Sequence, residues 1–455
     1  SATIETLQVK GFKAPTNFPK DKDGNIKITK ALFEDYARRP SEHENEAITF
    51  VCDYYSNKYS KEYMETFVES VEMAINGLLK ESSIIDISLL SDKEKERQDQ
   101  NNETKAEFPR EDIVTMFKRA AEKYPDRQAV IFGDEVLTYR QVDDISDRIA
   151  GYLTGKGIGH ESVVSVLIQR STFIVTASLG VLKAGAAYQP LDPTYPEERL
   201  NFMVKDSGCK LLISDEELVP RVSGYSGEVL YTKDIAELPE AEPVKNHPSS
   251  EDLFILLYTS GTTGVPKGVM LEHGNISNFC NWYRKFYDLT EDSRVAAYAS
   301  YGFDACMMDL YPALTTGASV CILSEQIRTD IVAMEELFKK EKITHAFMTT
   351  QVGRQFYMLS EADSLKHLST GGEKLTPVEL KGNITAFYNG YGPTECSIFS
   401  TVKLVDKSYR RVPIGKALTN YKLYVVDEQM RRVPPYVPGE LIISGLGVGR
   451  GYLNR

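Results

Sequence analysis

The stretch "FILLYTSGTTGVPKG", residues 254–268, joins a short apolar strand to a loop rich in glycine and hydroxyl side chains. Glycines let backbone amides approach an anion closely, and Lys267 adds a mobile positive charge. The common nucleotide-loop pattern Gly-x-x-x-x-Gly-Lys-Ser/Thr does not fit, because Pro266 precedes Lys267 and Gly268 follows it. The residues therefore predict a polyphosphate loop of another kind, with a polar surface turn as the alternative.

The segments around this loop alternate between helical and strand patterns. Between residues 139 and 214, helix-like stretches alternate with short apolar runs such as "SVVSVLI" and "CKLLIS", and the alternation recurs near 335–350. Such alternation favours parallel βαβ units with helices on both faces of the sheet. Residues 421–453 are strand-rich and punctuated by glycine and proline. We therefore predict an α/β fold with parallel sheets and a β subdomain.

The first hundred residues have a different character. Residues 47–56 predict a strand, and residues 60–81 have apolar side chains at helical spacing, which predicts an amphipathic helix. Residues 91–109 are polar, charged and almost free of apolar side chains. They cannot bury enough surface to form a core element, so we expect a solvated connector there.

The composition excludes several classes of protein. The chain has 455 residues, which at ~100–200 residues per domain predicts two or more domains. A formal net charge of -12 argues against a nucleic-acid partner and, more weakly, against an anionic membrane. No apolar run reaches the ~20 residues that span a bilayer, and six scattered cysteines without a Cys-x-x-Cys pair are typical of reduced thiols. We expect a cytoplasmic protein without a structural zinc site.

A second stretch, "NGYGPTECSI" at residues 389–398, carries chemistry of its own. Tyr391 lies between glycines, which suits stacking on a flat base. Thr394 offers a hydroxyl to a phosphate, and Glu395 offers a carboxylate to a hard cation such as Mg²⁺. A Gly-Pro turn with an exposed glutamate explains the same residues equally well, so the stretch alone leaves both readings open.

These two stretches resemble core motifs of the adenylate-forming superfamily, specifically of nonribosomal peptide synthetase adenylation domains. Four more motifs resemble the family in the expected order: "LTYRQV" (137–142), "LKAGAAYQPLDP" (182–193), "FDAC" (303–306, with Cys306 where the family has Ser) and "GELIISGLGVGRGYL" (439–453). Several long motifs in order make chance agreement negligible. The resemblance covers residues 108–455 and implies the large N-terminal core of an adenylate-forming enzyme.

The resemblance implies activation of an amino acid: its carboxylate attacks the α-phosphorus of ATP, giving aminoacyl-AMP and pyrophosphate. It also implies Mg²⁺ and a phosphopantetheine thiol on a carrier domain. By motif match, Thr263, Lys267, Thr394 and Glu395 are the catalytic residues, and Glu395 holds the metal. The residues implied to contact ATP and its phosphates are Thr259, Ser260, Gly261, Thr262, Thr263, Gly264, Lys267, Gly372, Glu373, Asn389, Tyr391, Gly392 and Thr394.

Asp304 separates substrate classes within this superfamily. The family's aspartate at this motif pairs with the α-ammonium of an amino acid, whereas ligases for acids without an amine usually lack it. A buried carboxylate is costly unless a cation meets it. The implied side-chain pocket is mostly apolar, and its glycines are expected to leave room, so we expect a hydrophobic amino acid, aliphatic before aromatic. The implied pocket residues are Ala305, Met308, Phe347, Ser369, Gly371, Gly390 and Ile398.

The resemblance also implies a domain plan. Residues 1–90 are similar to the end of a condensation domain, 91–108 to a linker, and 109–455 to the adenylation core. The family's small C-terminal subdomain is absent, which implies a core that binds both substrates and adenylates weakly. The expected partners are an amino acid and the peptidyl carrier and condensation domains of one megasynthase. Two alternatives remain open: a carboxylate–CoA ligase, and a fragment that binds without turnover.

Overall fold

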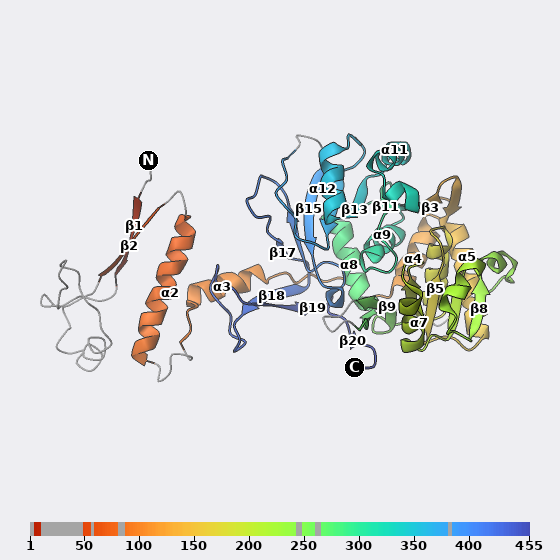
Figure 1. The fold of residues 1–455 in the computed structure, drawn as a ribbon, viewed down its shortest axis with the longest axis horizontal. Helices are drawn as coiled ribbons and strands as arrows, with labels where there is room; N and C mark the ends of the chain where they lie inside the picture. The colour runs from red at the N-terminus through yellow and green to blue at the C-terminus, as the bar shows by residue number, and fades with distance from the viewer. Residues whose placement is uncertain are drawn as a thin grey trace, which may run out of the picture. The chain divides into compact units, whose positions relative to one another are not determined.

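A computed structural model describes residues 4–10, 49–55, 59–80, 87–242, 248–259, 265–380 and 385–455. The chain forms two compact units (Figure 1). The larger comprises residues 104–422 and 443–455, and the smaller comprises residues 1–103 and 423–442. The loop residues Ser260, Gly261, Thr262, Thr263 and Gly264 lie outside the described residues.

Two mixed sheets form the larger unit. The strands at the centre of each sheet are parallel, as the βαβ pattern predicted, and antiparallel strands are added at the edges. The first sheet has the order β20 (Gly451–Tyr452), β10 (Lys267–Glu272), β9 (Leu253–Thr259), β6 (Ala187–Leu191), β5 (Val163–Leu167), β7 (Leu211–Ser214) and β8 (Glu228–Tyr231). The second has the order β17 (Lys416–Ala417), β16 (Thr401–Leu404), β15 (Ala386–Tyr391), β14 (His367–Gly371), β13 (His345–Thr349), β11 (Arg294–Ala297), β12 (Ser319–Ile322), β3 (Gln128–Phe132) and β4 (Glu135–Thr138).

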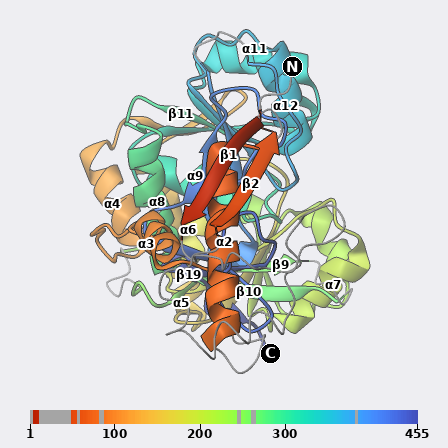
Figure 2. The same ribbon diagram turned by 90° about the vertical axis from the view of Figure 1, so that its left-hand side faces the viewer.

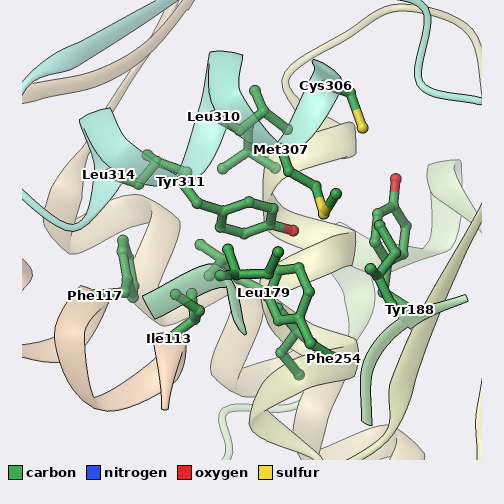
Figure 3. Packing of buried hydrophobic residues seen from close by; sticks show 14 of the residues in the cluster. Ile113, Phe117, Leu179, Tyr188, Phe254, Cys306, Met307, Leu310, Tyr311 and Leu314 are labelled. Atoms are coloured by element: carbon green, nitrogen blue, oxygen red, sulfur yellow. The ribbon is translucent and has the colours of Figure 1, made fainter. Parts of the chain in front are cut away.

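The main apolar core lies where five helices pack with strands of both sheets. These helices are α4 (Ile113–Lys123), α5 (Tyr139–Gly155), α6 (Phe173–Lys183), α8 (His273–Phe286) and α9 (Ala305–Leu314). Figure 3 shows Met307, Tyr311 and Leu314 of α9 meeting Leu179 of α6 and Phe254 of β9. This burial of one helix layer against both sheets fixes the positions of the strand ends that carry the quoted motifs.

Two smaller cores complete the larger unit. One lies between the second sheet and α11 (Ile331–Glu341) and α12 (Thr350–Leu359), near the short α10 (Glu325–Arg328). The other lies between the first sheet and α7 (Glu197–Asp206) with the 3-10 helix η3 (Glu216–Val222); a second 3-10 helix, η4 (Thr232–Glu237), follows β8. Each sheet therefore has helices on both faces, as predicted. Among the residues that the structure describes, no helix is long and apolar enough to cross a membrane.

A buried group of four charges ties α4, α5 and α6 together. Lys183, only 2% exposed, places its Nζ 2.5 Å from Asp143 Oδ1 and 2.8 Å from Asp147 Oδ1. Lys118 Nζ lies 3.2 Å from Asp143 Oδ1 and 2.9 Å from Asp147 Oδ2. Asp143 and Asp147 are four residues apart on α5, so both face the same side of the helix. Each charge in this group therefore has a partner of opposite sign.

The smaller unit confirms two sequence predictions and adds one helix that the sequence did not predict. β1 (Ile4–Lys10) pairs antiparallel with β2 (Thr49–Tyr55), next to the expected helix α2 (Lys61–Lys80), as Figure 2 shows. The polar segment expected to be a connector contains α3 (Asp92–Asn101). Ser91 caps its first turn, and Arg97 pairs with Glu94 at 2.7 Å. Capping and pairs three residues apart stabilise this helix without an apolar face.

The end of the chain forms the predicted β structure. β18 (Tyr421–Val426) and β19 (Glu440–Gly445) make a two-stranded sheet, and the last strand, β20, joins the first sheet of the larger unit. β20 pairs with β10, which begins at Lys267, so the sixth quoted motif ends beside the strand that follows the phosphate-loop motif.

Candidate functional site

The two described ends of the phosphate-loop motif lie side by side. Thr259 ends β9 and Lys267 begins β10, and these residues are partners in the antiparallel register. The Lys267 Nζ lies 5.1 Å from the centroid of the Tyr452 ring. Among the described residues, no carboxylate lies within 4.0 Å of Lys267, so its ammonium is available to an anion. Whether residues 260–264 bind phosphate stays a prediction.

Tyr452 also contacts the carboxylate expected to hold a metal. Its hydroxyl donates to Glu395 Oε1 at 2.5 Å. This hydrogen bond and the burial of the ring raise the pKa of Tyr452 to about 12. Glu395 lies in the 3-10 helix η5 (Thr394–Cys396), and its carbonyl accepts from Gly449 N at 2.8 Å. The two chemical motifs predicted from the sequence therefore meet through a tyrosine of the sixth motif.

Asp304 lies beside the same 3-10 helix. It precedes α9 and makes no side-chain cap hydrogen bond there. Burial raises the pKa of Asp304 to about 6; a hydrogen bond from the Thr394 side chain opposes this shift, and the charge of Glu395 adds to it. Among the described residues, no cationic side chain lies within 4.0 Å of Asp304. The fold thus brings Asp304, Thr394 and Glu395 together from motifs ninety residues apart in sequence.

The predicted pocket residues of the second sheet share one face. Phe347 of β13 is the register partner of Ser369 on β14, and Ser369 is the partner of Tyr388 on β15. Because side chains alternate along a strand, Gly371 and Gly390 lie on that same face. The Ser369 hydroxyl donates to the Tyr287 hydroxyl at 2.8 Å, so the polar member of this set has a hydrogen-bond partner. Ala305 and Met308 of α9 are buried in the same apolar core as Phe347.

The expectation that the two glycines leave room is wrong. A Cβ added at Gly390 would lie 2.2 Å from Phe399 Cζ, and one added at Gly371 would lie 3.1 Å from Phe399 Cε1. The Phe399 ring therefore fills the space above both glycines, and it lies 6.0 Å from the Phe347 ring in an edge-to-face arrangement. Sequence reasoning missed Phe399, although it directly follows Ile398; the only sequence signal was that position beside the motif.

The segment after Glu395 has an unusual backbone. Ser397 and Ile398 have φ values of +60° and +74°. Residues other than glycine rarely adopt such values, and β-branched residues do so least of all. The turn brings the chain back against Gly392, where an added Cβ would lie 2.4 Å from the Ile398 carbonyl oxygen. Ser397 holds the turn by donating from its hydroxyl to Gly447 O at 2.7 Å. Local strain of this kind gathers at functional sites, and here it directs Ile398 into the apolar core.

The predicted nucleotide residues divide into two groups. The Tyr391 side chain at the end of β15 is 40% exposed, so its ring is accessible to a base. Gly372, with φ +97°, has open space where a side chain would stand, and Glu373 beside it is exposed. Asn389 is different: its amide donates to Pro413 O at 3.0 Å, on the face opposite to Gly390. Whether Asn389 contacts a nucleotide stays a prediction.

The donor set fits ATP with Mg²⁺. Glu395 supplies a carboxylate, the kind of oxygen ligand that Mg²⁺ prefers, and only one of its two oxygens is taken by Tyr452. A trio with similar ligand atoms, His160, Glu161 and Asp252, lies elsewhere among the described residues, within 4.8 Å of one another. Arg450 donates to both carboxylate oxygens of Glu161. We therefore interpret that trio as part of an ion-pair cluster and not as a metal site.

Comparison with known families decides the membership of the chain. The model of the AMP-binding enzyme family matches residues 117–453, which include all the motifs above except the N-terminal segment. The chain belongs to the AMP-binding enzyme family. Its α/β fold with two mixed sheets is the adenylate-forming fold, which confirms the fold class predicted from the sequence.

Curated relatives of this family member are parts of much longer proteins. Bacitracin synthase 1 of Bacillus licheniformis is 38% identical over 357 residues, which is 78% of this chain and 7% of that protein. Surfactin synthase subunit 1 of Bacillus subtilis is 33% identical over 467 residues, covering 100% of this chain and 13% of that protein. This chain thus spans a small part of each relative.

Solved structures share the fold of the family member. The nonribosomal peptide synthetase FmoA3 matches with a TM-score of 0.82 at 23% identity, covering 89% of this chain and 46% of that one. A four-domain nonribosomal peptide synthetase bound to AMP and glycine matches with a TM-score of 0.79 at 25% identity, covering 90% of this chain and 31% of that one.

Proposed function

We propose that this chain is an amino-acid-activating core of a nonribosomal peptide synthetase. One observation carries the proposal: Asp304, a carboxylate without a cationic partner among the described residues, stands beside Thr394 and Glu395. An α-ammonium near Asp304 would hold the substrate with its own carboxylate close to the α-phosphate of ATP. The family membership and the likeness to a synthetase bound to AMP and glycine support this proposal.

The side chains divide the work by charge. Lys267 supplies the positive charge that accompanies the departing pyrophosphate, because its ammonium has no carboxylate partner among the described residues. The Thr394 hydroxyl, which meets Asp304 in the free protein, would turn to the α-phosphate when ATP binds, and Tyr391 would pack against adenine. Glu395 would hold Mg²⁺, which screens the repulsion between the substrate carboxylate and the triphosphate. Residues 259–264 would surround the outer phosphates with backbone amides and hydroxyls.

The substrate side chain would be apolar, aliphatic before aromatic. Ala305, Met308, Phe347 and Ile398 are buried and carry no charge, so a charged side chain would be desolvated without a partner. The Phe399 ring over the two glycines reduces the space available, which favours an aliphatic side chain over an aromatic one. A pocket of this kind separates neighbouring aliphatic side chains by only ~1–3 kcal/mol per methylene.

The acceptor would be the phosphopantetheine thiol of a peptidyl carrier domain in the same megasynthase. Two similarities support this: the relatives include a bacitracin synthase and a surfactin synthase subunit, and the second matches the whole of this chain. Residues 1–90 would then be the end of a condensation domain and residues 91–108 the connection to the core at 109–455, with α3 inside that connection. Activity of the core by itself would be weak.

A matched pair of substrates tests the proposal. ATP–pyrophosphate exchange is measured with a panel of amino acids and with the α-hydroxy acid that has the side chain of the best amino acid. We expect exchange to peak on an apolar amino acid and the hydroxy acid to be at least ~10-fold poorer, because only the amine pairs with Asp304. The Asp304→Asn variant should lose this preference. Equal exchange with both compounds, or transfer to free coenzyme A, would refute amino-acid activation for a carrier domain.

A further inference from the structure

Tyr452 contacts two groups of opposite charge. The Lys267 ammonium lies 5.1 Å from the ring centroid, and the Tyr452 hydroxyl donates to Glu395 Oε1 at 2.5 Å. A cation is attracted to the face of an aromatic ring, and an ionised carboxylate accepts a short hydrogen bond from a phenol. Each charge therefore contacts the tyrosine, and no ion pair joins Lys267 to Glu395 in the described part of the chain.

A similar trio, with an aspartate in place of the glutamate, also occurs on the surface, with a different outcome. Lys403 lies 5.3 Å from the Tyr409 ring centroid, and the Tyr409 hydroxyl donates to Asp406. There the lysine also reaches the carboxylate directly, with Nζ 3.1 Å from Asp406 Oδ1. A lysine, a tyrosine and a carboxylate thus close into an ion pair where nothing keeps them apart. At the candidate site both charges contact the tyrosine, but in the described part of the chain they make no ion pair with each other.

Tyr452 is held in place by its own strand. β20 pairs with β10 through Tyr452 and Val269, and Leu453 N donates to Gly268 O at 2.8 Å. Arg450, two residues earlier, is fixed by ion pairs to Glu161 at 2.6 Å and to Glu272 at 2.8 Å. These contacts fix the backbone of Tyr452 without using the side chains of Lys267 and Glu395.

We propose that Tyr452 is a positioning residue for nucleotide and metal binding: its ring keeps the Lys267 ammonium off Glu395, and its hydroxyl fixes one oxygen of that carboxylate. The other oxygen of Glu395 is thereby left for the divalent cation, and Lys267 is left for phosphate. The inference rests on the proposed function, because it assumes that ATP with a divalent cation binds here. When ATP and the cation bind, neither Lys267 nor Glu395 has to be released from an ion pair.

Two substitutions separate the two parts of this role. Tyr452→Phe keeps the ring and removes the hydroxyl, so Glu395 loses its fixed orientation; we expect Mn²⁺ to bind the protein–ATP complex ~10-fold more weakly, as removal of outer partners of metal ligands typically does. Metal-free ATP binding should stay unchanged. Tyr452→Leu removes the separating ring as well, so Lys267 can pair with Glu395, and metal-free ATP binding should also weaken several-fold.

A rescue experiment isolates the ion pair. In Tyr452→Leu, the additional change Glu395→Gln removes the charge that captures Lys267, so metal-free ATP binding should return to the wild-type value. Mn²⁺ binding is followed by the electron paramagnetic resonance signal of the free ion, and ATP binding by a fluorescent ATP analogue, both on the full chain. Tyr409→Phe serves as the matched control, since it removes the same hydroxyl from the surface trio and should change neither quantity.

The outcomes separate this inference from the proposed function. If the wild-type chain binds no ATP, the proposed function fails. If it binds ATP and Tyr452→Phe behaves like Tyr409→Phe, the positioning role is wrong. Loss of metal-free ATP binding in Tyr452→Leu without rescue by Glu395→Gln would exclude the separation of charges. Loss of thermal unfolding cooperativity in Tyr452→Phe would assign Tyr452 to the stability of β20 and also overturn the inference.

Discussion

The buried charges on α4, α5 and α6 and the charges of the candidate site follow opposite rules. Lys118 and Lys183 each meet both Asp143 and Asp147, so every charge in that group has partners of opposite sign. Asp304 has no cationic partner among the described residues, and burial raises its pKa to about 6. A buried charge with a partner can be tolerated by the fold, whereas a charge without one costs stability until a ligand supplies the partner.

This contrast predicts that neutralising a charge has opposite effects in the two regions. In the paired group the substitution should leave uncompensated charges behind and destabilise the protein. At the site the substitution should remove an uncompensated charge, so the free protein should become no less stable while ligand binding is lost. If neutralising a charge lowered the unfolding free energy in both regions, Asp304 would have a structural partner and the comparison would be mistaken.

The largest effect is expected from Lys183→Met. Lys183 is buried, and its removal leaves Asp143 and Asp147 with only Lys118 to compensate two carboxylates. Breaking a buried pair on one side typically costs ~3–5 kcal/mol of unfolding free energy. Urea denaturation measures this change. The control is Lys233→Met, which breaks an exposed pair with Glu216 and should cost less than ~1 kcal/mol. Equal losses in both variants would contradict the role assigned to the buried group.

The next effect is expected from Asp304→Asn. Loss of a charge-assisted contact to the α-ammonium should weaken amino-acid binding by ~1.5–3 kcal/mol, roughly ten- to a hundredfold. The unfolding free energy of the free protein should stay the same or rise, because a partly buried carboxylate without a cationic partner is removed. Calorimetric titration with the best amino acid and urea denaturation measure the two quantities. A large loss of stability would instead identify Asp304 as part of the fold.

Gly390→Ala tests whether the apolar side of the site is packed as tightly as the main core. The added methyl would overlap the Phe399 ring, and overpacking of this kind typically costs ~1–3 kcal/mol. Gly155→Ala is the matched control, since nothing lies within 4 Å of an added Cβ there and alanine favours the helix by up to ~1 kcal/mol. Thermal unfolding distinguishes the two. Unchanged stability of Gly390→Ala would mean that Phe399 moves freely, and that the glycine leaves room after all.

The elements of the larger unit could be predicted well, because each of them follows a local pattern. α4 and β3 to β7, for example, follow apolar periodicity and turn residues that lie within a few positions of one another. α3 could not be predicted, because a cap and ion pairs stabilise it rather than an apolar face. Its polar sequence gave the signal of a solvated connector.

The site was predicted only as far as single motifs reach. Asp304, Thr394 and Glu395 were each recognised within their own motif, and the fold confirms that they lie together. Two contacts could not be predicted. The first is that of Phe399 with Gly371 and Gly390, and the second is that of Tyr452 with Lys267 and Glu395. Both depend on strands that are far apart in sequence and adjacent only through the sheets. Asn389 was recognised within its motif, but its partner could not be predicted. Its side chain lies on the face of β15 opposite to Gly390, and there its amide donates to Pro413 O.

The smallest effect is expected from pH, and it sharpens the contrast at a single carboxyl group. The pKa of Asp304 is raised to about 6, first by burial and then by the charge of Glu395, so the group is protonated below that pH in the free protein. Only the carboxylate pairs with an ammonium. Amino-acid affinity should therefore be constant near pH 7 and fall about tenfold by pH 5, since each pH unit below the pKa reduces the ionised fraction tenfold.

Stability should change in the other direction over the same range. The unfolded carboxyl group has an ordinary, lower pKa, so between about pH 4 and pH 6 the folded state binds more protons than the unfolded state. The contribution of Asp304 to the unfolding free energy therefore decreases as pH rises through this window, whereas amino-acid affinity increases. Asp309, whose pKa burial raises to about 8, titrates above the window. Subtracting the unfolding free energy of Asp304→Asn from that of the wild type cancels the contributions of Asp309 and of the histidines. If this difference were flat from pH 4 to pH 7, Asp304 would be ionised throughout, and a partner within the chain would have to account for its charge.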